Sequence, residues 1–160
     1  MPSPRSWIAI AGAGDAAPWE LAAAEQAGAA VAEAGCGLVC GGLGGVMEAA
    51  CRGARSRGGL TVGLLPGIDR DAANGWVVVA LPTGLGEARN ALVVQAADAV
   101  VAIGGGWGTL SEIALALKAG VPVVGVGTWE PALSGAVIEG VVAVDGPREA
   151  VEEALRQIRR

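Results

Sequence analysis

The sequence contains no histidine, tyrosine or phenylalanine, and its aromatic residues are five tryptophans. Histidine-based triads and tyrosine acid–base chemistry are therefore excluded. Any catalysis would depend on carboxylates, arginine, lysine, hydroxyls, thiols or backbone amides.

Long apolar runs are also missing, although 52% of the residues are hydrophobic and the mean hydropathy is +0.51. Glycine, proline or a charge interrupts the apolar segments before they reach the roughly 20 residues that a membrane span needs. Residues 1–6 lead into a strand-like run without the apolar core and cleavage site of a secretory signal. We therefore expect a single cytoplasmic domain over residues 1–160, with no membrane partner.

Positive charge is scarce, because 11 lysines and arginines face 16 acidic residues and leave a net charge of −5. The basic residues are scattered except for two small groups, Arg52, Arg55 and Arg57, and Arg156, Arg159 and Arg160. Binding to nucleic acid depends on a basic footprint, so nucleic acid is not an expected partner.

Cysteine is limited to Cys36, Cys40 and Cys51. The number is odd, and no histidine is present to complete a zinc site of the usual Cys/His kind. We interpret all three as small, buried apolar thiols and predict no metal site.

Short β-branched runs alternate with alanine-rich stretches of helical length. This alternation predicts an α/β, Rossmann-like, doubly wound sheet of about seven mostly parallel strands, with helices on both faces. The predicted strands are Trp7–Ala11, Leu38–Cys40, Thr61–Leu65, Val77–Leu81, Ala99–Ile103, Val121–Val126 and Val141–Val144. The predicted helices are Pro18–Ala34, Val46–Arg57, Glu87–Ala97, Leu110–Ala119 and Pro147–Arg159.

Clusters among the 27 glycines follow the predicted strands, where the carboxyl-end loops of a parallel sheet bind ligands. Glycine turns that open helices also expose backbone amides to phosphate. Tight βα turns alone would explain one such cluster, but two loops of this kind favour a phosphate-bearing ligand. The glycines we expect at this site are Gly12, Gly14, Gly41, Gly42, Gly44, Gly45, Gly105, Gly106 and Gly108.

Gly12-x-Gly14-x-x-Ala17 also satisfies a dinucleotide fingerprint. That fingerprint needs an acidic residue at the end of the second strand to bind the ribose hydroxyls, and Val39, Cys40 and Gly41 stand there instead. An NAD-dependent oxidoreductase is therefore disfavoured. No glycine run is followed by Lys-Ser or Lys-Thr, which excludes a P-loop.

Arg89 is predicted in the first turn of a helix, where the helix dipole disfavours a cation. A bound phosphate would reverse that penalty, and arginine suits bidentate phosphate pairing. The alternative is a surface arginine paired with Glu87 or another carboxylate. Asp15, in the first glycine loop, could contact a ribose hydroxyl or bond to its own turn.

Thr109 and Glu112 have the spacing of a capping box, with Thr109 as the N-cap and Glu112 bonded back to the N-cap amide. Glu112 also follows a glycine-rich turn suited to an anion, so it could instead face a ligand, with or without Thr109 as the cap. Trp107 and Trp129 fall on ligand-end loops and could stack on a flat heterocycle. We expect Trp7, Trp19 and Trp76 to pack in the core or between helix and sheet.

Three segments resemble one known group: CGGLGGVMEAA (Cys40–Ala50), GLGEARN (84–90) and GGGWGTLSEIALALKAGVPVV (Gly104–Val124). They are similar to the SLOG superfamily of Rossmann-like proteins. That group includes the LOG-type cytokinin riboside 5'-monophosphate phosphoribohydrolases and the molybdenum cofactor carrier proteins. The resemblance implies a phosphate-bearing, nucleotide-like ligand and extends from about Trp7 to Trp129.

Two departures look like the carrier branch. The phosphoribohydrolases have a proline where this chain has Gly104, and their catalytic arginine is usually followed by lysine, whereas Asn90 follows Arg89 here. The resemblance thus implies a carrier or sensor that binds a molybdopterin-type cofactor or a nucleotide and needs no cofactor for chemistry. Its ligand contacts would include Arg89, Asn90, Trp107, Thr109 and Glu112 besides the glycine loops.

The alternative implied by the resemblance is a phosphoribohydrolase that cleaves the N-glycosidic bond of a nucleoside 5'-monophosphate. Arg89 and Glu112 would then be the catalytic residues. Asp15 would be the candidate for the general acid that protonates the leaving base. The family's habit and the alanine-rich helices further suggest a homodimer or homotetramer.

Overall fold

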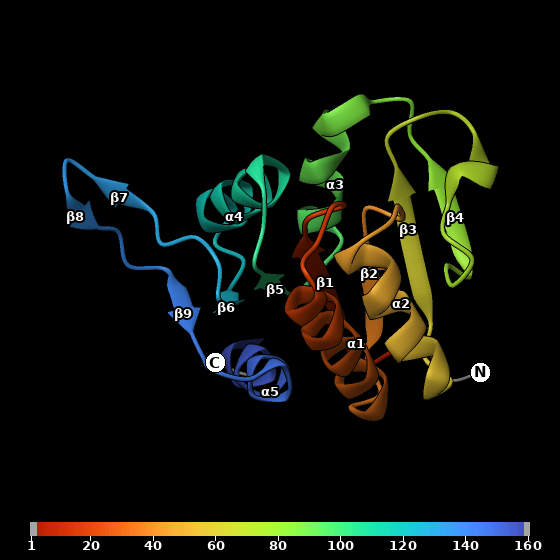
Figure 1. Cartoon of the computed structure of the whole chain (residues 1–160), viewed down its shortest axis with the longest axis horizontal. Helices are drawn as coiled ribbons and strands as arrows, with labels where there is room; N and C mark the ends of the chain where they lie inside the picture. The colour runs from red at the N-terminus through yellow and green to blue at the C-terminus, as the bar shows by residue number, and fades with distance from the viewer. Residues whose placement is uncertain (1–2, 159–160) are drawn as a thin grey trace.

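Seven strands form one sheet, in the order β4-β3-β2-β1-β5-β6-β9, in the computed structural model, which describes residues 3–158 (Figure 1). All six neighbouring pairs in this sheet are parallel. The strands are β1 (Trp7–Gly12), β2 (Gly37–Cys40), β3 (Thr61–Leu65), β4 (Val79–Pro82), β5 (Ala99–Ile103), β6 (Val123–Val126) and β9 (Val141–Ala143). The predicted fold class is confirmed.

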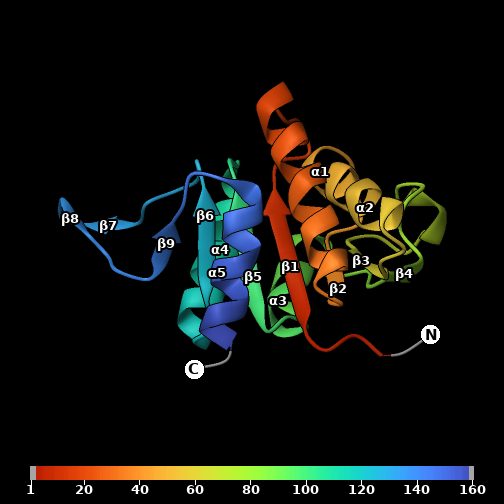
Figure 2. The same ribbon diagram turned by 90° about the horizontal axis from the view of Figure 1, so that it is seen from below.

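Helices cover both faces of the sheet, which is the arrangement that right-handed parallel crossovers produce (Figure 2). One face carries α1 (Pro18–Glu33), α2 (Val46–Ser56) and α5 (Pro147–Ile158), and the other carries α3 (Asn90–Gln95) and α4 (Trp107–Ala119). The strands alternate between these layers. In β1, Ile8 and Ile10 pack against the first layer, whereas Ala9 and Ala11 pack against the second.

The order of the strands reverses between β1 and β5. From β1 the chain proceeds outward through β2, β3 and β4, and it then crosses back to β5 on the other side of β1. The loops that leave β1 and β5 therefore separate above the sheet, and open α/β sheets bind ligands at such a switch point.

Two predicted helices need correction, and one element was not predicted. The helix predicted at Leu110 begins three residues earlier, at Trp107, and the helix predicted over Glu87–Ala97 is split into a 3-10 turn, η2 (Gly86–Arg89), and α3. A short antiparallel hairpin of β7 (Ala132–Leu133) and β8 (Ala136–Val137) projects from the body of the molecule between β6 and β9 (Figures 1 and 2). No pattern in the sequence predicted this hairpin. No helix within residues 3–158 is long and apolar enough to cross a membrane.

Candidate functional site

A pocket of about 280 Å³ lies at the carboxyl end of the sheet, at the switch point. Its walls come from the loop after β1, the start of α2, the end of β3, the η2–α3 junction and the first turns of α4. The lining residues are Gly12, Ala13, Gly14, Leu43, Met47, Pro66, Glu87, Arg89, Asn90, Gly106, Gly108, Thr109 and Glu112. Eight of the residues predicted for the site are among them, together with five that were not predicted.

Arg89 is buried, with 8% of its surface exposed, and carbonyl groups fix its guanidinium. Its Nε donates to Leu64 O at 2.8 Å and its Nη2 donates to Gly41 O at 3.5 Å, so the side chain spans the ends of β3 and β2. No carboxylate pairs with it within salt-bridge distance among residues 3–158. The alternative of a surface ion pair is therefore wrong, and Arg89 is a buried cation that lines the pocket with no carboxylate within salt-bridge distance among the described residues.

Asn90 connects Arg89 to α4. Its Oδ1 accepts from Arg89 Nη1, and its Nδ2 donates to Ser111 Oγ at 2.9 Å. Ser111 Oγ in turn donates to Gly108 O at 2.8 Å. Asn90 therefore positions the guanidinium relative to the first turn of α4, which a lysine at that position could not do because it has no acceptor.

Glu112 is not part of a capping box. The N-cap of α4 is Gly106, so Thr109 is the third residue of the helix, and Glu112 lies a turn further on. Glu112 is 7% exposed and lines the pocket. Burial raises the pKa of this carboxyl to about 7, against the opposing effect of the nearby Arg89 charge. Glu112 therefore exchanges a proton close to neutral pH.

Thr109 contributes the single buried side-chain oxygen or nitrogen that lacks a hydrogen-bond partner within the described residues. It is 2% exposed and lines the same pocket. The amides of the first turn of α4 also have no partners within that helix, as at every helix start. The hydroxyl, the amides and Arg89 together form a set of donors suited to an oxyanion.

Glu20 is a structural residue of the site that was not predicted from the sequence. It is buried in the first turn of α1, where its Oε2 accepts from Ala17 N at 2.6 Å and its Oε1 accepts from Gly105 N at 3.1 Å. Gly104, next to it, has a φ of +53°, and a Cβ there would overlap the Glu20 carboxylate. A Glu at the third position of a helix was a visible signal for a local cap, but its bond to a loop 85 residues away was not.

Other predicted residues lie beside the pocket rather than in it. Asp15 is exposed and lines a neighbouring hollow with Gly45 and Glu48. In the second glycine loop, Gly41 holds Arg89 through its carbonyl, and the amide of Gly42 donates to Cys40 Sγ at 3.3 Å. That loop reaches the pocket through Leu43, and Met47 of α2 lines the pocket beside it.

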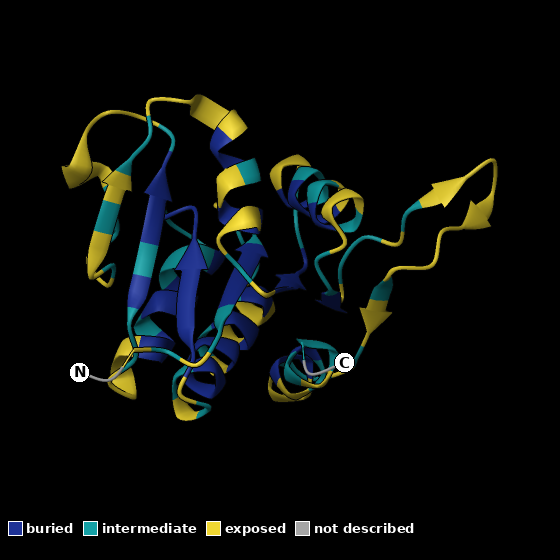
Figure 3. Cartoon of the chain, turned by 180° about the vertical axis from the view of Figure 1, so that it is seen from behind, coloured by how far each residue is buried: buried dark blue, intermediate teal, exposed yellow. Residues whose placement is uncertain are grey.

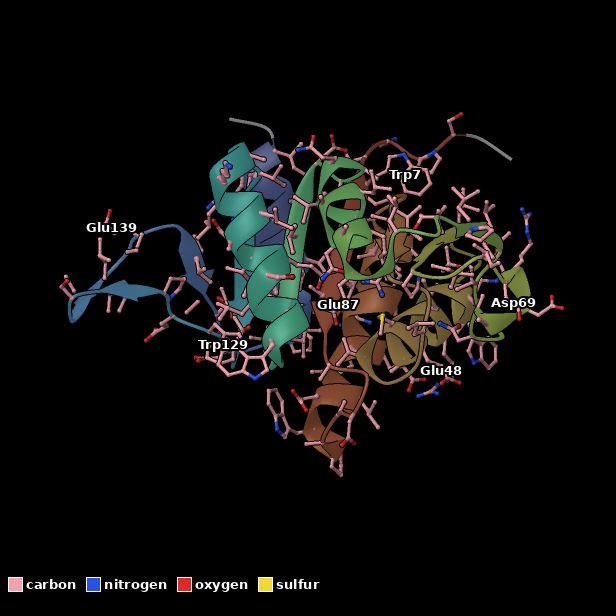
Figure 4. All side chains as sticks on the ribbon, turned by 90° about the horizontal axis from the view of Figure 1, so that it is seen from above. Trp7, Glu48, Asp69, Glu87, Trp129 and Glu139 are labelled. Carbon is pink, nitrogen blue, oxygen red and sulfur yellow. The ribbon has the colours of Figure 1, made fainter. Side chains whose placement is uncertain are left out.

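The burial of the tryptophans differs from the prediction. Trp7 is half-buried against the sheet, but Trp19 and Trp76 are 49% and 41% exposed, so the expectation of core packing is wrong for both. Trp107 and Trp129 lie close together, with ring centroids 5.4 Å apart. Trp129 lies beside α4 on the side away from Glu87 (Figure 4).

All three cysteines are buried, as predicted, and Cys40 Sγ lies 3.6 Å from Cys51 Sγ. No cluster of three or more metal-ligating Cys, Asp or Glu side chains occurs within residues 3–158.

Comparison with known proteins identifies one matching family and several solved structures with a similar fold. The model of the SLOG cluster4 family matches residues 5–153. An uncharacterised protein of Archaeoglobus fulgidus is 42% identical over 144 residues, which cover 90% of this chain and 91% of the relative.

Two solved structures share the whole fold. The molybdenum cofactor binding protein of the phototrophic bacterium Rippkaea orientalis superposes with a TM-score of 0.87 at 37% identity, covering 100% of this chain and 99% of that one. The molybdenum cofactor carrier protein of Chlamydomonas reinhardtii gives a TM-score of 0.83 at 33% identity, covering 97% and 99%.

Proposed function

The chain belongs to the SLOG cluster4 family, and from this premise we propose that it binds a phosphate-bearing, nucleotide-like ligand as a carrier or sensor. The ligand is a molybdopterin-type cofactor or a nucleotide, and it binds at the switch-point pocket. The observation that carries the proposal is the buried Arg89 guanidinium, which has no carboxylate within salt-bridge distance among residues 3–158 and lines the same pocket as the start of α4.

The donor set fits the phosphate of such a ligand. Arg89 supplies a fixed positive charge, the first turn of α4 supplies backbone amides, and Thr109 supplies a hydroxyl with no other partner. Glu112 in its protonated form adds a fourth donor. The identity of two structural neighbours as molybdenum cofactor binding and carrier proteins supports the molybdopterin-type ligand.

Two residues favour binding over cleavage. Asn90, in place of the lysine usual in the phosphoribohydrolases, bonds to Arg89 and fixes its position. Gly104, in place of their proline, takes a φ of +53° that proline cannot adopt. The loop before α4 therefore follows a path that the hydrolase motif does not allow.

The binding proposal is tested by thermal unfolding with ribose 5-phosphate and AMP as probes. A ligand that binds the folded state raises Tm, and at 100 times Kd the stabilisation is about 2.7 kcal/mol. We expect this shift in the wild type and its loss in Arg89→Ala. Arg70→Ala, which removes an exposed arginine outside the pocket, is the matched control. The absence of any shift would contradict the proposal and favour a purely structural role.

The second candidate is phosphoribohydrolase activity, and the Glu112 carboxyl with its pKa of about 7 is the observation that favours it. Glu112 would stabilise the oxocarbenium-like transition state or activate water, and Arg89 would orient the substrate. Asp15 does not line the pocket, so it is badly placed to protonate the leaving base, whereas Glu87 does line it.

One assay separates the two candidates. The pure protein is incubated with AMP or an N6-substituted AMP, and free base and ribose 5-phosphate are quantified. We expect no turnover, together with retention of molybdopterin-type fluorescence after the protein is loaded. Turnover that disappears in Glu112→Ala would overturn the carrier function in favour of the hydrolase.

A further inference from the structure

A second hollow of about 470 Å³ borders the pocket on the far side of the β5–α4 loop. Trp19 at the start of α1 and Trp129 after β6 line this hollow, together with Gly104, Gly105 and Gly127. Gly106 lines the first pocket, and its carbonyl accepts from Trp129 Nε1 at 3.2 Å. Gly105 lines the second hollow and Gly106 lines the first, and consecutive Cα atoms are about 3.8 Å apart. The two hollows are therefore adjacent.

The two indoles are held in place while part of their surface stays exposed. The hydrogen bond to Gly106 and the tilted contact with Trp107, at an interplanar angle of 30°, fix the Trp129 ring. Trp19 packs directly on Gly127, where a Cβ would lie only 2.8 Å from the indole. Exposed aromatic faces on fixed rings are costly in water, and they match the flat apolar face of a heterocycle.

The charged residues of the hollow are both acidic. Glu20 already accepts two backbone amides, at Ala17 and Gly105, so its oxygens are engaged. Glu130 is exposed at the rim and forms no ion pair within the described residues. No lysine or arginine lines the hollow. It therefore disfavours phosphate and favours a ring with N–H donors at its edge.

We propose that the groove between Trp19 and Trp129 binds the heterocyclic ring of the ligand, and that Glu130 selects rings with a 2-amino-4-oxo edge. Such an edge, found in guanine and in pterins, presents two adjacent N–H donors that a carboxylate accepts together. Adenine lacks that pair of donors. The inference rests on the proposed function, because the anionic part of the ligand then lies in the Arg89 pocket.

The test compares GMP, IMP and AMP, with Kd measured by quenching of tryptophan fluorescence. GMP and IMP differ only in the 2-amino group, so their ratio isolates its hydrogen bond to Glu130. We expect GMP to bind about tenfold more tightly than IMP, as for a hydrogen bond to a charged group, and more tightly than AMP. In Glu130→Gln, the Kd values for GMP and IMP should lie within about twofold of each other. Glu139 is an exposed carboxylate on the projecting hairpin, so Glu139→Gln should leave the ratio of the two Kd values unchanged.

Trp19→Leu gives an independent readout. It should weaken the binding of GMP and of AMP by similar factors, because stacking does not distinguish the bases. Ribose 5-phosphate has no nucleobase, so its affinity should not change. Trp76→Leu, at a partly exposed tryptophan outside both hollows, is the control.

Equal affinities for the three nucleotides, or an unchanged GMP to IMP ratio in Glu130→Gln, would overturn the ring site. Retained ribose 5-phosphate binding would in that case leave the proposed function intact. If the wild type does not bind ribose 5-phosphate at all, the proposed function is instead overturned. A change of molecular mass in Trp19→Leu, measured by light scattering, would assign Trp19 to a subunit interface and also overturn the ring site.

Discussion

At the residue scale, Glu112 couples stability to pH. Its pKa is raised from 4.5 to about 7 by burial, so the folded chain holds a proton that the unfolded chain has released. The free energy of unfolding should therefore fall as pH rises from about 4.5 to about 7, with the whole penalty present above that range. At about 1.4 kcal/mol per pKa unit, the penalty is of the order of 3 kcal/mol.

Glu112→Gln should remove this dependence. Denaturant titrations from pH 4.5 to 8.5 would measure the difference between wild type and variant, which cancels the carboxylates common to both. We expect the variant to gain stability relative to the wild type across that window. A difference that is constant with pH would show that Glu112 titrates normally.

Thr109 gives a prediction of the opposite kind, because its hydroxyl has no partner within the described residues. An unsatisfied buried polar group costs about 1–3 kcal/mol, so the isosteric Thr109→Val should keep or raise the stability of the free protein. The same change should weaken the binding of ribose 5-phosphate by about tenfold if the hydroxyl donates to the ligand. Calorimetry and denaturation measure the two effects separately.

Thr128→Val is the matched control for Thr109. The Thr128 hydroxyl donates to Gly104 O at 2.6 Å, so this variant should be less stable than the wild type. Lower stability of Thr109→Val with unchanged ligand affinity would contradict a ligand-binding hydroxyl.

At the element scale, the sequence predicted the strands well because they are short, largely β-branched apolar runs, and because glycine follows each strand of the large sheet. The start of α4 was misplaced because Thr109 and Glu112 mimic a capping box, whereas Gly106 precedes the first helical residue. The hairpin of β7 and β8 was missed because its strands have two residues each, too few for any periodic pattern. Contacts such as Glu20 to Gly105 depend on tertiary structure, which no local pattern encodes.

Gly104 tests the loop between β5 and α4. Its φ of +53° is strained for any residue with a Cβ, and the Cβ would also overlap Glu20. We expect Gly104→Ala to lower the free energy of unfolding by about 2–4 kcal/mol, and Gly104→Pro to be worse because proline fixes φ near −65°. Gly67→Ala, where φ is not positive and nothing lies within 4 Å of the added Cβ, should have little effect.

A double-mutant cycle with Glu20→Ala locates the cause of the loss at Gly104. Removing the carboxylate relieves the overlap but not the backbone strain, so the two changes should be non-additive. Strict additivity would mean that strain alone accounts for the loss.

At the scale of the whole molecule, the projecting hairpin predicts self-association. Leu133, Val137 and Ile138 are 70%, 64% and 44% exposed, and the hairpin stands apart from the buried sheet (Figure 3). A two-stranded hairpin is at best marginally stable alone in water, and clustered exposed apolar side chains usually mark an interface. We therefore expect a homodimer or homotetramer in which a second copy of the chain covers the hairpin.

Light scattering should give a mass of two or four times the 15.7 kDa chain. Leu133→Glu combined with Val137→Glu should shift the mass toward the monomer, because burying two new carboxylates at the interface is strongly unfavourable. Ile68→Glu changes a side chain that is 86% exposed but lies outside the hairpin, so it should leave the mass unchanged. If the double variant keeps the wild-type mass, the hairpin does not form the interface, and its apolar side chains face water in the assembled protein as they do in the single chain.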